Sequence, residues 1–160
     1  MDIKLAGRPG GWRRGYTLLE VLAVVLLLGI LASIVTSSFS DAEKDSANTV
    51  FAHDIRVAAD VFSAYWLQND FTFPADKAPG VFPPEMASYL GRMDWSTETP
   101  IGGQWEWDYN IYGVAAAVSV SNPDRTVAEM AEIDSIIDDG NLMTGNFRAR
   151  DGGYMMVVKE

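Results

Sequence analysis

The apolar side chains divide the chain into two parts with different expected environments. Residues 16–40 are apolar almost throughout, and Glu20 is the one side chain among them expected to be charged. At about 1.5 Å per residue, a helix of this length measures roughly 37 Å, which is enough to cross a hydrocarbon core of about 30 Å. The pattern therefore predicts a transmembrane helix over residues 16–40.

Beyond residue 40 the apolar positions recur with the period of an amphipathic helix. Polar residues at 41–45 mark the exit into water, and apolar side chains then return at spacings of three and four. This pattern predicts one helix from Tyr16 to about Leu67, apolar all round in its first half and on one stripe in its second. The stripe comprises Val50, Phe51, Ile55, Ala58, Val61, Phe62, Tyr65 and Trp66.

The segment after this helix is rich in proline. Residues 71–84 contain Pro74, Pro79, Pro83 and Pro84, so they predict a loop rather than a helix or a central strand. Residues 84–91 begin with proline and end with glycine, which is typical of a short helix.

Alternation of period two predicts a first β-hairpin. Residues 104–110 alternate aromatic and polar side chains, residues 114–121 are rich in valine and alanine, and Tyr112-Gly113 supplies a turn. The aromatic side chains share one face, and its burial against the long helix is favoured because large apolar surfaces are normally buried. An exposed ladder that binds carbohydrate by stacking is the alternative. The aromatic residues are Trp105, Trp107 and Tyr109.

A helix and a second hairpin complete the predicted fold. Asn122 and Pro123 are expected to open a helix that ends near Gly140. Residues 146–150 and 154–159 flank a glycine-rich turn and are expected to pair. About four antiparallel strands laid on the amphipathic part of one long helix give an α+β fold.

Charge and composition narrow the function. Residues 1–15 hold four basic side chains against one acidic one, a net of +3, so the formal total of −10 leaves −13 for residues 16–160. Basic residues before a membrane segment stay in the cytoplasm, so the acidic remainder is expected to face outward. A nucleic-acid partner is not predicted for so acidic a chain. The chain has no cysteine, which excludes disulfides and thiolate chemistry.

No catalytic constellation is recognisable. His53 is the only histidine, and it lacks the companions that a metal site or a nucleophile–base pair requires. We therefore predict no enzymatic activity, no catalytic residue and no metal ligand.

Glu20 is the anomaly of the apolar segment. A carboxylate near the middle of a spanning helix costs about 2.5–3.5 kcal/mol on insertion scales. Cleavage after Gly15 would place Glu20 in the first turn of a helix, where the helix dipole favours an anion. The new α-amino group of Tyr16 on a neighbouring helix could then neutralise the carboxylate. A signal-anchor whose glutamate lies at the membrane interface is the alternative.

These residues resemble a known processing signal. Gly15-Tyr16-Thr17-Leu18-Leu19-Glu20, preceded by a short basic leader, is similar to the class III signal of type IV pilins and type II secretion pseudopilins. The resemblance implies cleavage between Gly15 and Tyr16 by a prepilin peptidase, N-methylation of Tyr16, and guidance of each subunit into a filament by Glu20. Tyr16 replaces the usual Phe or Met. Ser37 stands where many pilins carry a helix-kinking proline.

The resemblance also implies a domain organisation and a location. Residues 1–15 would be a leader removed on maturation, residues 16–40 a transmembrane and filament-core helix, and residues 41–160 a periplasmic head. The chain would cross the bacterial inner membrane once, with its N-terminus in the cytoplasm, before it enters a filament.

The expected function is that of a structural subunit of a type IV pilus or a type II secretion pseudopilus. Its partners would be the prepilin peptidase, identical or related pilin subunits, the membrane, and the assembly ATPase with its platform. The short acidic chain without a disulfide favours the pseudopilin. A membrane-anchored monomeric binding module, using the aromatic strand or the acidic insertion, is the alternative.

Calcium is a candidate cofactor, because carboxylates suit it and some major pseudopilins use it where other pilins use a disulfide. The acidic side chains lie within the predicted helix. Their spacing differs from that of an EF-hand loop, which favours a solvated helix face. They are Glu129, Glu132, Asp134, Asp138 and Asp139.

Overall fold

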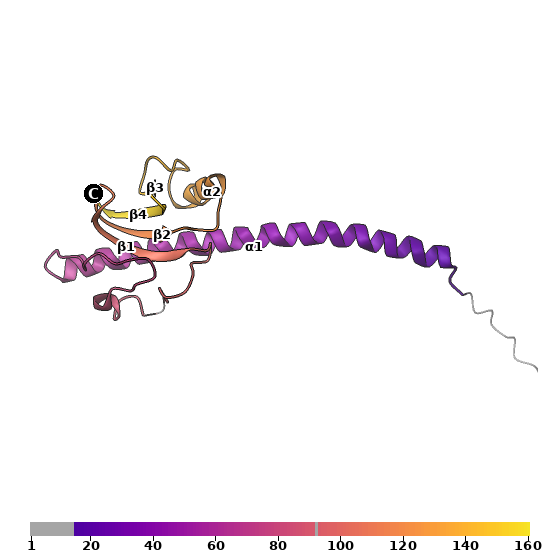
Figure 1. Ribbon diagram of the computed structural model, residues 1–160, viewed down its shortest axis with the longest axis horizontal. Coiled ribbons are helices and arrows are strands. Elements are labelled where there is room, and N and C mark those ends of the chain that lie inside the picture. The colour runs from indigo at the N-terminus through magenta and orange to yellow at the C-terminus, as the bar shows by residue number, and fades with distance from the viewer. Residues whose placement is uncertain (1–14, 92) are drawn as a thin grey trace, which may run out of the picture. The chain divides into compact units, whose positions relative to one another are not determined.

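A computed structural model describes residues 15–91 and 93–160, with the backbone alone at residues 35–38 (Figure 1). The residues form two compact units, one that ends at Asp41 and one from Ala42 to Glu160, which we call the head. The predicted leader lies outside the described residues except for Gly15. The elements are α1 (Leu18–Gln68), a 3₁₀ turn η1 (Pro84–Met86), β1 (Gln104–Ile111), β2 (Val114–Ser121), α2 (Val127–Ile137), β3 (Phe147–Arg150) and β4 (Gly153–Lys159).

The N-terminal part of α1 is apolar and unburied. Side chains from Leu18 to Ile34 are all exposed, and the helix continues without interruption through residues 37 and 38. Among the described residues, α1 is the one helix long and apolar enough to cross a membrane, with a mean hydropathy of 2.8 in its most apolar window. It begins two residues later than the sequence pattern predicts.

The C-terminal end of α1 is closed by a recognisable cap. The amide of Phe71 donates to the carbonyl of Trp66 at 3.0 Å, five residues back, while Asp70 adopts a positive φ of 51°. The ring of Phe71 then packs edge-on against Trp66, with centroids 4.8 Å apart. This is a Schellman motif with its usual apolar contact, and Asp70 takes the position more often held by glycine.

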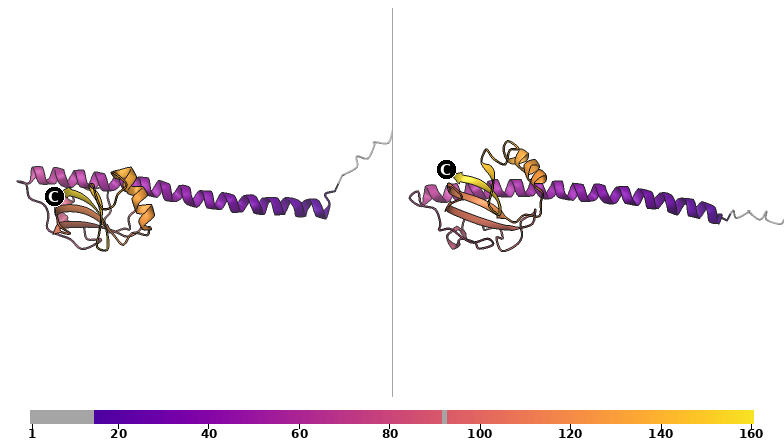
Figure 2. Two further views of the ribbon diagram at one scale, coloured as in Figure 1. Left: turned by 90° about the horizontal axis from the view of Figure 1, so that it is seen from above. Right: turned by 45° about the horizontal axis from the view of Figure 1, so that its top comes forward.

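The four strands form one antiparallel sheet in the order β1-β2-β4-β3. The β1–β2 turn has Tyr112 at φ 55° and Gly113 at φ 80°, the type I′ geometry that matches strand twist. Figures 1 and 2 show the sheet along one side of the head's part of α1. The predicted α+β, pilin-like fold of one long helix and a four-stranded antiparallel sheet is confirmed.

Aromatic stacking between α1 and β1 forms the centre of the core. Phe62 stacks on Trp107 with centroids 3.8 Å apart, and Phe51 stacks on Trp105 at 5.4 Å. The exposed fractions of Trp105 and Trp107 are 3% and 0%. Core packing is therefore confirmed, and the alternative of an exposed carbohydrate-binding ladder is wrong. Val50, predicted to lie on the buried stripe, is 46% exposed.

Two predicted helices differ from the structure. Residues 84–91 form only the turn η1 followed by further turns, because so short a segment gains few hydrogen bonds against the cost of helix nucleation. The second helix, α2, starts at Val127 rather than at Asn122-Pro123. Its N-cap is Thr126, whose side chain accepts from the amide of Glu129 while Glu129 accepts from the amide of Thr126. This reciprocal capping box sets the start of the helix.

Candidate functional site

The processing motif lies where the first helix begins. The side chain of Glu20 accepts from the amide of Thr17 at 2.8 Å and from its hydroxyl at 3.1 Å. The amide of Glu20 in turn donates to the Thr17 hydroxyl at 3.2 Å. Thr17 and Glu20 thus form a second capping box, which satisfies amides that a helix start would otherwise leave unpaired.

The capping box leaves the predicted cleavage junction outside the helix. Gly15 and Tyr16 precede Leu18, the first helical residue, and the Tyr16 residue is 88% exposed. Among the described residues, and apart from Gly15 and its chain neighbours, no atom lies within 4 Å of the point where a side chain on Gly15 would begin. The bond between them is therefore in open, non-helical chain, the kind of segment that proteases cut.

Sequence reasoning missed Thr17. It identified Glu20 and sought a partner on a neighbouring subunit, whereas the structure brings Glu20 to a residue three positions earlier. The available signal was the spacing Thr-x-x-Glu before an apolar run, which is the sequence form of a capping box.

Two of the acidic side chains around α2 accept hydrogen bonds from backbone amides, hydroxyls and one lysine. Glu129 pairs with Lys44 at 2.8 Å, and this hydrogen bond, with those from Thr126, lowers the pKa of Glu129 to about 2. Asp139 accepts from the amide of Asn141 and the hydroxyl of Thr144, both at 2.8 Å. Within residues 15–91 and 93–160, no group of three or more acidic or histidine side chains is placed to hold a metal ion.

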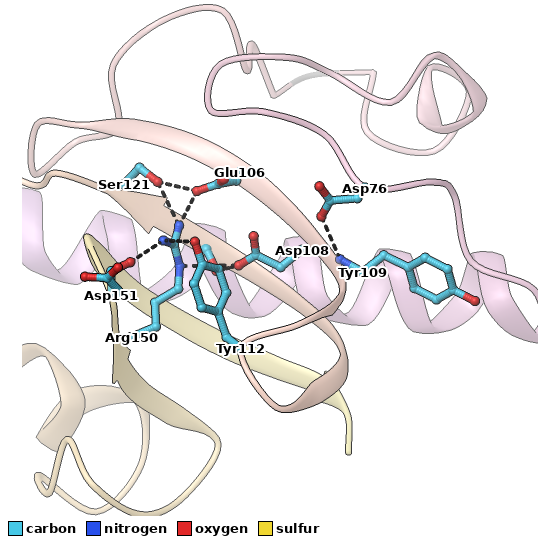
Figure 3. A network of polar contacts seen from close by, with 9 residues as sticks. Asp76, Glu106, Asp108, Tyr109, Tyr112, Ser121, Arg150 and Asp151 are labelled. Carbon is cyan, nitrogen blue, oxygen red and sulfur yellow. Dashed lines mark hydrogen bonds and ion pairs between the residues drawn. The ribbon is translucent and has the colours of Figure 1, made fainter.

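A second polar site lies on the face of the sheet opposite α1 (Figure 3). Arg150, at the end of β3, donates to Glu106 of β1 and to the hydroxyl of Ser121 on β2. Its Nε lies 3.3 Å from Asp108, also on β1. The guanidinium is 4.5 Å from the ring centre of Tyr112, which covers it as a cation–π partner. We call Glu106, Asp108, Ser119, Ser121 and Arg150 the outer-face cluster.

The strand register explains how Arg150 reaches β1. Arg150 pairs with Gly153 of β4, and Gly153 pairs with Ser121 of β2, so one row crosses the sheet. Gly153 has no side chain to block the path of the guanidinium. A Cβ at Gly153 would also collide with the carbonyl oxygen of Val120.

Burial perturbs one member of the outer-face cluster. Asp108 is 1% exposed, and desolvation raises its pKa to about 6 against the lowering effects of the Ser119 hydrogen bond and the Arg150 charge. Glu106 and Asp76 add repulsion that raises the pKa further. The sequence pattern placed these polar positions of β1 on the face opposite the aromatic side chains and did not indicate that this face is buried. The signal in the sequence was the acidic character of these β1 positions, which the basic residues in the last hairpin can neutralise.

The comparisons with known proteins bear on the N-terminal segment. A family profile described as the prokaryotic N-terminal methylation motif matches residues 13–36. No curated protein and no solved structure matches the chain.

The motif and the fold together define a class of protein. The chain is prepilin-like, with a cleavage and methylation motif at the start of an apolar helix and a pilin fold. The motif indicates the type IV pilin and pseudopilin family, whose members are structural and not enzymatic. It implies processing by a prepilin peptidase and assembly with pilin subunits. The apolar helix and the motif suggest anchoring in the inner membrane before assembly.

Proposed function

We propose that the chain is a structural subunit of a type II secretion pseudopilus or a type IV pilus, polymerised through its N-terminal helix. The observation that supports this best is the apolar surface of α1, where the exposed fractions of the large side chains from Leu18 to Ile34 range from 52% to 86%. Such a surface requires lipid or other subunits around it. In the proposed cycle residues 16–40 exchange lipid for neighbouring helices, whose association in membranes depends on close packing.

Maturation would begin with removal of residues 1–15. Cleavage between Gly15 and Tyr16 fits an exposed junction that lies just before the capping box. The mature chain would then expose residues 41–160 in the periplasm, with the N-terminus at the cytoplasmic side of the inner membrane. The assembly ATPase and its platform would extract the subunit into the filament.

Glu20 would bond first to Thr17 in the membrane and later to a neighbouring subunit in the filament. In the membrane Thr17 hydrogen-bonds the carboxylate of Glu20 and so reduces the cost of placing it near lipid. After cleavage the methylated amine of Tyr16 becomes available, and on assembly this amine on one subunit pairs with Glu20 on another. The pair fixes the register of the helices, because an unmatched buried charge costs about 3–5 kcal/mol.

The first experiment is the intact mass and N-terminal sequence of the membrane-extracted protein, made with and without a co-expressed prepilin peptidase. We expect a chain that starts at methylated Tyr16 only when the peptidase is present. A chain that starts at Met1 in both preparations would contradict the proposal.

Filament yield then tests Glu20. Glu20→Ala should give inserted and processed monomer but few filaments. Thr17→Val keeps the carboxylate of Glu20, so it should reduce the filament yield less. Normal yield from Glu20→Ala would refute its role in assembly.

The choice between the two filaments rests on composition. The absence of cysteine and the strongly acidic mature chain favour the pseudopilus. Co-expression with each set of assembly proteins, followed by electron microscopy of sheared filaments, would decide it. The alternative function, a binding module that uses the aromatic strand, lacks an exposed aromatic surface because Trp105 and Trp107 are buried.

A further inference from the structure

The outer-face cluster contains an imbalance of buried charge. Two carboxylates, Glu106 and Asp108, lie within ion-pair distance of one guanidinium, that of Arg150. The side chains are 12%, 1% and 3% exposed, respectively. With both acids ionised, the three groups hold a net charge of −1 almost out of contact with water, which is an unfavourable arrangement.

Asp108 is the acid left without full compensation. Arg150 directs its Nη2 to Glu106 and Ser121. Its Nε lies 3.3 Å from Asp108 but makes no hydrogen bond within the part of the chain that the structure describes. Oδ2 of Asp108 accepts from Ser119, whereas Oδ1 is buried and accepts no hydrogen bond from the described residues. A proton on Asp108 would therefore remove a charge that its surroundings only partly offset.

We propose that the outer-face cluster is a proton-responsive clasp, in which Asp108 takes up a proton on mild acidification and so strengthens the attachment of the β3–β4 hairpin to β1 and β2. The connection is direct, because Arg150 at the end of β3 reaches across β4 and β2 to β1. Neutral Asp108 leaves Arg150 in a balanced pair with Glu106. Ionised Asp108 adds a second negative charge to that pair.

The charged groups around Asp108 act on its proton affinity in both directions. Glu106 on the same strand and Asp76 in the loop beside β1 both repel its negative charge, and Arg150 from β3 attracts it. Tyr112 covers Arg150 and accepts a hydrogen bond from it at 3.2 Å. Farther along β3, Arg148 is paired with Glu160 at 2.8 Å. The pKa of Asp108, raised to about 6 chiefly by burial, places the transition in a mildly acidic range.

The sign of the effect follows from linkage. A pKa higher in the folded than in the unfolded chain means that the folded chain binds the extra proton. The stability from Asp108 is complete below its ordinary pKa of 3.8 and is lost as the pH rises through about 6. The unfolding equilibrium constant should therefore rise roughly 25-fold between pH 4.5 and pH 7.5 through this group alone.

The test is denaturant unfolding of the processed full chain in detergent micelles, followed by fluorescence of the buried tryptophans between pH 4.5 and 7.5. Asp108→Asn removes the titrating group, so its unfolding constant should rise roughly 25-fold less over this pH range than that of the wild type. Asp94→Asn is the matched control. Asp94 is an exposed acid whose pKa is lowered by hydrogen bonds from Ser96, so its removal should not abolish the rise.

A second variant keeps the proposal falsifiable if Asp108→Asn does not fold. Ser119→Ala removes the hydroxyl that donates to Asp108 and that lowers its pKa. The rise in the unfolding constant should then move to higher pH. Parallel pH profiles of wild type and Asp108→Asn, or a midpoint that Ser119→Ala leaves unchanged, would overturn the clasp.

Discussion

Arg56 joins the two helices of the head. It lies on α1, and its Nη2 donates to the carbonyl oxygens of Ile136 and Ile137 at 2.5 Å each. These are the last residues of α2, which has no basic side chain in its own last turn. Arg56 thus supplies from another element the positive charge that a helix C-terminus favours.

The cost of losing this contact can be worked from its geometry. A hydrogen bond to a charged donor contributes about 1.5–3 kcal/mol. The two bonds share one nitrogen and so are not additive, and removal leaves both carbonyls short of a partner. We expect Arg56→Gln to destabilise the C-terminal turn of α2 by about 2–3 kcal/mol. The stability of Arg56→Lys should lie between those of the wild type and Arg56→Gln, because lysine keeps the positive charge but lacks the planar guanidinium group.

The assay is amide hydrogen exchange of the full chain in micelles, combined with urea unfolding. Protection should fall most at the C-terminal end of α2, and the matched control Asp60→Asn, on the exposed side of α1, should leave it unchanged. Equal exchange rates in α2 for wild type and Arg56→Gln would refute the reasoning.

Three further substitutions test the core, a cap and the sheet. Phe62→Ala removes the ring stacked at 3.8 Å on Trp107 and should cost about 3–5 kcal/mol in urea unfolding. Thr126→Val removes the N-cap hydroxyl of α2 and should cost about 0.5–2 kcal/mol, with faster exchange in its first turn. Gly153→Ala places a methyl group against the carbonyl oxygen of Val120 and should lower the melting temperature, at a cost of about 1–3 kcal/mol.

Local sequence patterns determined much of this protein. The apolar run before residue 40, the amphipathic stripe after it, the alternation in the first hairpin and the glycine-rich turn of the second each involve neighbouring positions. Each could therefore be recognised without knowledge of the fold. The processing motif is also contiguous. The Thr17–Glu20 capping box is equally local, because the spacing Thr-x-x-Glu before an apolar run identifies it.

Tertiary structure decided what depends on distant residues. Glu106 and Arg150 are 44 positions apart and meet only because the order β1-β2-β4-β3 aligns Ser121, Gly153 and Arg150 in one row. The same register buried Asp108, although the strand pattern alone places it only on the face opposite the tryptophans. A period-two pattern states which side chains share a face. Only the arrangement of strands determines what else lies on that face, and hence which charges must compensate one another.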